Sequence, residues 1–137
     1  MDREVIEQKL ESLRHCLRRI ETKCPEDAQT LASDPDLQDI VALNLSRAVQ
    51  VCVDIGAHLI SGMEVPPPDT MGQTFDLLAG AGVLSEALAG RLKKAVGFRN
   101  IAVHSYETIN WQIVHSIAKN QLVDFTEFAR VVALSCT

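Results

Sequence analysis

The spacing of apolar residues is the feature that most constrains the fold of this chain. In residues 2–23 the large apolar side chains recur every three or four positions, at Ile6, Leu10, Leu13, Leu17 and Ile20. A second series occupies residues 35–61, at Leu37, Val41, Leu45, Ala48, Cys52, Ile55 and Leu59. This period places each series along one face of an α-helix. Because no alternating strand pattern competes with it, the sequence predicts an all-α fold.

Prolines and capping residues mark the limits of these two helices. Cys24-Pro25 ends the first, because proline disfavours the helical conformation in the residue before it. We expect a loop from there to about Ser33. Asp34-Pro35 then predicts a helix start, with the aspartate as N-cap and the proline at the first helical position. Gly62 and the prolines at 66–68 end the second helix.

Three further helices are expected after the prolines. Thr70 and Gln73 have the spacing of a capping box, which predicts a short helix over residues 71–79. Ser85 is the expected N-cap of the next helix.

The last helix should cover residues 109–134, capped by Thr108 or Asn110. The prediction is therefore one domain, residues 1–137, that forms an antiparallel bundle of four main helices and a short one.

The charge of the chain is unevenly distributed. A net charge of −5 disfavours binding to nucleic acid, whose protein partners normally present a basic surface. Between residues 91 and 104, however, the sequence has no acid and four cations, which are Arg91, Lys93, Lys94 and Arg99. This local excess fits a phosphate-binding surface, and it also fits an ordinary solvated helix face.

Other classes of protein are disfavoured by what the sequence lacks. Its four cysteines show no Cys-x-x-Cys pair, so we expect reduced thiols and no metal site. The N-terminus opens with charges of both signs and has no apolar signal region. No apolar run approaches the roughly 20 residues that cross a bilayer. We therefore expect a cytoplasmic protein with no membrane partner.

The chemistry is concentrated in residues 97–106, Gly-Phe-Arg-Asn-Ile-Ala-Val-His-Ser-Tyr. Arg99 carries a permanent charge on a planar donor group that suits phosphate oxygens. His104 can accept or donate a proton near neutral pH. Asn100 and His104 share a helix face. Arg99 and His104 are five positions apart, about 140° around a regular helix, so they point in different directions.

Three arrangements could still combine the arginine and the histidine. The helix could be irregular near Gly97, where a missing side chain would allow a bend or the close approach of another helix. The long side chain of Arg99 could bridge the gap. A two-fold dimer axis could instead bring two copies of the motif face to face.

The phrase Arg-Asn-x-x-x-His-x-Tyr, preceded by Gly-Phe, resembles the motif of HEPN-domain ribonucleases. The similarity is strongest to HepT toxins of the HepT/MntA toxin–antitoxin type. It extends to residues 54–59, the proline break and residues 75–83, and thus over nearly the whole chain. The resemblance implies a homodimeric RNA endonuclease toxin that needs no metal or cofactor, with mRNA or tRNA as substrate and no expected action on DNA.

The resemblance also assigns roles to individual residues. Arg99 and His104 would be catalytic, and Asn100, Tyr106 and Lys94 would support them or bind RNA. Tyr106 would in addition receive AMP from an MntA-like nucleotidyltransferase antitoxin. The added phosphates would fill the site with negative charge that competes with RNA.

Less specific interpretations remain open at this point. His104 could be a core histidine satisfied by Asn100, and Arg99 could pair with Glu107 or another acid. Asp54 and His58, four positions apart in one helix, are expected to hydrogen bond at a surface or subunit interface. Phe98 is expected in the core. The whole chain could instead be a non-catalytic helical module that binds nucleotide or protein, or a plain structural bundle.

Overall fold

The computed structural model describes residues 2–136, and all regular structure in that range is helical. Two long helices, α1 (Arg3–Lys23) and α3 (Pro35–Ile60), make the most extensive packing in the bundle. All five predicted apolar residues of α1 are buried, and so are six of the seven predicted for α3, with Leu37 half-buried. The predicted α-helical fold and both predicted helix limits are confirmed to within a residue.

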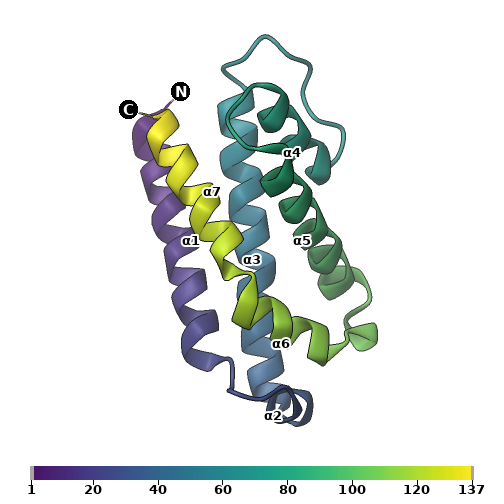
Figure 1. Cartoon of the computed structure of the whole chain (residues 1–137). Coiled ribbons are helices and arrows are strands. Elements are labelled where there is room, and N and C mark those ends of the chain that lie inside the picture. Colours follow the sequence, from purple (N-terminus) through teal and green to yellow (C-terminus); the bar gives the residue numbers. More distant parts are fainter. Residues whose placement is uncertain (1, 137) are drawn as a thin grey trace.

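The expected loop before α3 is wrong. Residues Ala28–Ser33 form a short helix, α2, whose N-cap Asp27 accepts a hydrogen bond from the Thr30 N–H at 2.7 Å. Six residues are fewer than two helical turns, too short for an apolar period to be recognised. Its Leu31 is fully buried, and α2 closes one end of the bundle (Figure 1). Asp34 caps α3 as predicted, accepting from the Leu37 N–H at 3.1 Å.

The short predicted helix is α4 (Met71–Gly80), and Thr70 caps it by accepting from the Gln73 N–H at 3.2 Å. The side-chain oxygen of Gln73 accepts a hydrogen bond from the Asp69 N–H and not from the Thr70 N–H, so the capping box is shifted by one residue. Helix α4 packs closely on α3 at Gly56. A Cβ added at this glycine would lie 2.4 Å from Thr74 Cγ2, so the close contact requires glycine.

The predicted last helix is interrupted. A 3₁₀ turn, η1 (Tyr106–Thr108), is followed by α6 (Trp111–Asn120) and α7 (Leu122–Ser135). Asn110, one of the two expected caps, accepts from the backbone of Gln112 and Ile113. The chain turns at Gln121, and Figure 1 shows α7 running back along the bundle to end beside the start of α1. The structure thus divides the chain into seven α-helices over residues 2–136, against five expected.

Helix α3 is central to the bundle and unusually apolar. By length and composition alone it could cross a membrane, with a mean hydropathy of 1.4 over its best 18-residue stretch. This corrects the expectation that no segment approaches such a span. In the structure, 56% of that stretch is buried by the surrounding helices, as is usual for the core helix of a bundle.

Candidate active site

Helix α5 (Glu86–His104) carries the motif, and only its first half is embedded in the core. Ser85 caps it, accepting from the Leu88 N–H at 3.1 Å, as predicted. Its fully buried residues are Leu88, Ala89, Leu92 and Val96, and none of them follows position 96. The last two turns therefore emerge from the bundle with their polar side chains accessible. Phe98, expected in the core, is half-buried and packs against it.

The helix is continuous through the motif. Residues 86–104 are all α-helical, and nothing lies within 4 Å of a Cβ built on Gly97. Neither an irregular helix nor the close packing of another helix at Gly97 is therefore observed. Arg99 and His104 keep the angular separation of a regular helix, about 140°. Of the three proposed arrangements, the bridging arginine side chain and the two-fold dimer remain.

The two catalytic candidates are accessible to solvent and make few side-chain contacts. His104 is the last residue of α5 and is exposed, so the interpretation as a core histidine is wrong. Arg99 is half-buried, and its Nη1 donates to Asn100 Oδ1 at 3.3 Å. Asn100 thus hydrogen bonds the arginine and not the histidine. No ion pair within residues 2–136 engages Arg99, so its expected alternative pairing with Glu107 is not found.

The local positive charge is partly neutralised. Arg91 donates to Asp124 at 2.8 Å, and Lys93 pairs with Asp76 at 3.0 Å. Lys94 and Arg99 are engaged in no ion pair in the described part of the chain. The cations available to a phosphate ligand are therefore the two that the sequence analysis assigned to the site.

Tyr106, in the turn after α5, is held from two sides. Its hydroxyl donates to Asp39 Oδ1 on α3 at 2.5 Å, and its ring meets the edge of Trp111 at 5.8 Å between centroids. Partial burial raises the pKa of the Tyr106 phenol above its ordinary value, and the Asp39 carboxylate raises it further.

Asp39 contacts the motif but was not among the predicted site residues. It lies 67 positions before Tyr106 and belongs to no recognisable motif. The available signal was weak: Asp39 is an acidic residue near the start of an otherwise apolar helix, which predicts only an exposed position.

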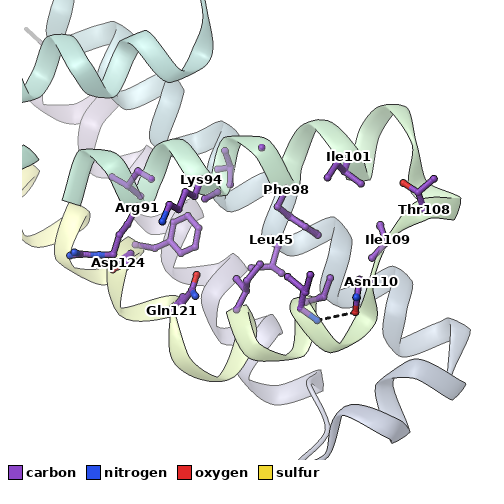
Figure 2. A pocket seen from close by; sticks show the side chains of 18 residues that line it. Leu45, Arg91, Lys94, Phe98, Ile101, Thr108, Ile109, Asn110, Gln121 and Asp124 are labelled. Carbon is purple, nitrogen blue, oxygen red and sulfur yellow. Dashed lines mark hydrogen bonds and ion pairs between the residues drawn. The ribbon is translucent and has the colours of Figure 1, made fainter. Parts of the chain in front are cut away.

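A cavity of about 520 Å³ lies between α5, α6 and the start of α7, with α3 behind it. Figure 2 shows Lys94, Phe98 and Ile101 along the α5 wall, with Asn110 and Gln121 on the opposite side. The lining is mostly apolar. Arg99, Asn100, His104 and Tyr106 are not among its lining residues, so the cavity lies apart from the predicted polar residues of the motif. Of the predicted site residues, only Lys94 reaches the cavity.

Asp54 and His58 of α3 contact the beginning of α1. Asp54 receives bonds from Lys9 at 3.4 Å and from Gln50 at 2.9 Å. The His58 ring accepts from the Asp2 N–H at 3.2 Å. These contacts join α3 to the beginning of α1. Within residues 2–136 Asp54 and His58 do not hydrogen bond to each other, and a subunit interface at this pair stays a prediction. Within residues 2–136 no group of three or more His, Cys, Asp or Glu side chains is placed to hold a metal ion.

Comparison with known proteins gives a consistent result. The family model described as "Ribonuclease HepT-like" matches residues 13–132. A curated relative from Shewanella oneidensis, named mRNA nuclease HepT, is 35% identical over 129 residues, which cover 94% of this chain and 96% of the relative.

Solved structures agree with the sequence match. A tri-AMPylated Shewanella oneidensis HEPN toxin in complex with MNT antitoxin has a TM-score of 0.90 at 34% identity, covering 98% of this chain and 99% of the other. A mutant of a toxin–antitoxin complex named MntA-HpeT has a TM-score of 0.88 at 34% identity, covering 95% and 98%. The chain described here belongs to the HepT-like ribonuclease family.

Proposed function

We propose that this chain is the RNA-cleaving toxin of a toxin–antitoxin pair and that its active site is built on Arg99 and His104. The observation that carries the proposal is the emergence of the last turns of α5 from the bundle. There an exposed histidine and an arginine engaged by no carboxylate lie five positions apart on the same stretch of helix. The relative named mRNA nuclease HepT supports RNA, and mRNA in particular, as the substrate.

The proposed reaction uses the 2′-hydroxyl of the substrate. His104 accepts the proton of this hydroxyl as its oxygen attacks the adjacent phosphorus. Arg99 stabilises the negative charge that develops on the phosphoryl oxygens. The bond to the 5′-oxygen breaks, leaving a 2′,3′-cyclic phosphate and a 5′-hydroxyl. Such a reaction requires no metal or cofactor, and it leaves DNA uncut because DNA lacks the attacking hydroxyl.

The leaving 5′-oxygen must receive a proton, and the motif supplies one histidine per chain. We propose that a homodimer provides the second, with the partner subunit's His104 as the acid. This arrangement also overcomes the angular separation of Arg99 and His104 on one helix, since the two motifs would meet across the two-fold axis. Asn100 would orient the arginine, and Lys94 and Tyr106 would contact the RNA.

We further propose that an MntA-like nucleotidyltransferase antitoxin silences the enzyme by transferring AMP to Tyr106. The phenol lies two residues beyond His104, so phosphates attached there would repel the RNA backbone from the site. The AMPylated state of the solved Shewanella toxin with its MNT antitoxin supports this regulation. We also propose that residues 1–137 act as one domain in the cytoplasm.

The test is incubation of purified chain with total cellular RNA in EDTA, after intact mass has shown that Tyr106 is unmodified. Wild type should cut, and His104→Ala should lower the rate by roughly 10²–10⁴-fold while RNA binding is retained. His15→Ala, which removes an exposed histidine from α1, is the matched control and should cut like wild type. Equal cleavage by wild type and His104→Ala would contradict the proposal. Binding without any cleavage by the wild type would favour the non-catalytic module.

A further inference from the structure

The contact between Tyr106 and Asp39 goes beyond what RNA cleavage requires. Asp39 is an exposed residue of α3, and the only hydrogen bond found for its side chain within residues 2–136 is the one from the tyrosine hydroxyl. No ion pair in that range neutralises its carboxylate. A free carboxylate therefore lies directly against the oxygen that is the proposed acceptor of AMP.

We propose that Asp39 is the general base for AMP transfer, accepting the proton of the Tyr106 hydroxyl as this oxygen attacks the nucleotide. The inference rests on the regulation proposed above, and it adds a catalytic residue that the modified chain itself supplies.

The geometry around the tyrosine suits this role. The hydroxyl oxygen is 2.5 Å from Asp39 Oδ1, within the distance needed for direct proton transfer. The Tyr106 ring also packs against Trp111 in a T-shaped contact, 5.8 Å between centroids, which supports the ring in this orientation. Tyr106 is still 38% exposed, so part of its side chain is accessible to another protein.

Attack of the Tyr106 hydroxyl on a phosphorus atom requires a base to accept its proton. A neutral phenol is a weak nucleophile, and the raised pKa of Tyr106 keeps it protonated at neutral pH. When its oxygen forms a bond to the α-phosphorus of a nucleoside triphosphate, the bond from that phosphorus to the bridging oxygen breaks. Pyrophosphate leaves, and the phenolic proton passes to the Asp39 carboxylate. The products are the tyrosyl–AMP ester, pyrophosphate and a protonated carboxyl group.

The experiment measures the initial rate of AMP incorporation by intact mass, with purified chain, its nucleotidyltransferase, Mg²⁺ and ATP. Asp39→Asn keeps the side-chain size but cannot accept the proton. It should slow incorporation by roughly 10²–10⁴-fold with the KM for the chain little changed, and its rate should rise with pH as solvent ionises the phenol. Asp39→Glu, which retains a carboxylate, should recover part of the rate.

Asp36→Asn is the matched control, because it removes an exposed carboxylate from the same end of α3. It should incorporate AMP at the wild-type rate. If Asp39→Asn also does so, Asp39 is not the base and the inference is overturned, while the proposed regulation stands. If the wild type takes up no AMP, or Tyr106→Phe takes up as much as wild type, the regulation itself fails and the inference fails with it.

Discussion

The side chains of the motif differ in how firmly the fold holds them. His104 is exposed at the end of α5 and its ring has no hydrogen-bond partner within residues 2–136, whereas Tyr106 contacts both Asp39 and Trp111. A proton-transfer residue that must meet RNA benefits from access, and a residue that must be recognised by a modifying enzyme benefits from a fixed position. The proposed catalytic residue, His104, is therefore accessible, and the proposed modification site two positions later is held by its neighbours.

The Tyr106 phenol should titrate well above the ordinary tyrosine pKa of about 10. Since Tyr106 is the single tyrosine of the chain, the alkaline rise in tyrosinate absorbance reports this group alone. Asp39→Asn should move the midpoint to lower pH, because a negative neighbour is removed. A midpoint that is unchanged in Asp39→Asn would show that the contact does not persist in solution.

The raised pKa of Tyr106 also makes the free energy of unfolding depend on pH. A folded-state pKa that is raised above the unfolded value favours the protonated phenol in the fold. Its stabilising contribution is therefore complete below pH about 10 and is lost as the pH rises from there through the folded pKa. The partial exposure of Tyr106 keeps this contribution small.

Sequence patterns located the motif because its residues are close together in the chain. The pattern could not locate Asp39, because a contact over 67 positions depends on how α3 and α5 pack. Nor could it show that the cavity lies apart from Arg99, since the position of the cavity is set by the turn into α6.

At the level of secondary structure, long helices were predicted well and short or interrupted ones were not. Helices α1 and α3 contain many apolar repeats, so their limits follow from the sequence. Helix α2 has one buried residue and gives no period. The break between α6 and α7 occurs at Gln121 with no proline or glycine, and there tertiary packing overrides the local preference for one continuous helix.

Two glycines provide a test of how α5 and α3 are built. Gly90 lies inside α5 with nothing within 4 Å of a Cβ built on it. Gly90→Ala should raise the free energy of unfolding by about 0.5–1 kcal/mol, because alanine loses less backbone entropy in a helix. Gly56→Ala should lower it by about 1–3 kcal/mol, since the new Cβ would collide with Thr74. Denaturant unfolding measures both, and a shift of both variants in the same direction would contradict this account of the packing.

At the scale of the whole molecule, an acidic chain is proposed to bind RNA through a small basic area. Two of the four clustered cations are neutralised by Asp124 and Asp76, so Lys94 and Arg99 provide the remaining local charge. A two-fold dimer would double this area and bring a second His104 to the site. Affinity for RNA should then fall as salt rises, with the shallow slope expected when few phosphates are neutralised.

The most direct measurement of the central claim uses two synthetic RNAs that differ only at the cut site. One carries the ordinary nucleotide, and the other has hydrogen in place of its 2′-hydroxyl. In EDTA, unmodified wild type should cut the first to a 2′,3′-cyclic phosphate and leave the second intact, and His104→Ala should cut the first roughly 10²–10⁴-fold more slowly. Cleavage of the deoxy-substituted RNA at the wild-type rate would show that this hydroxyl is not the nucleophile and that the proposed role of His104 is wrong.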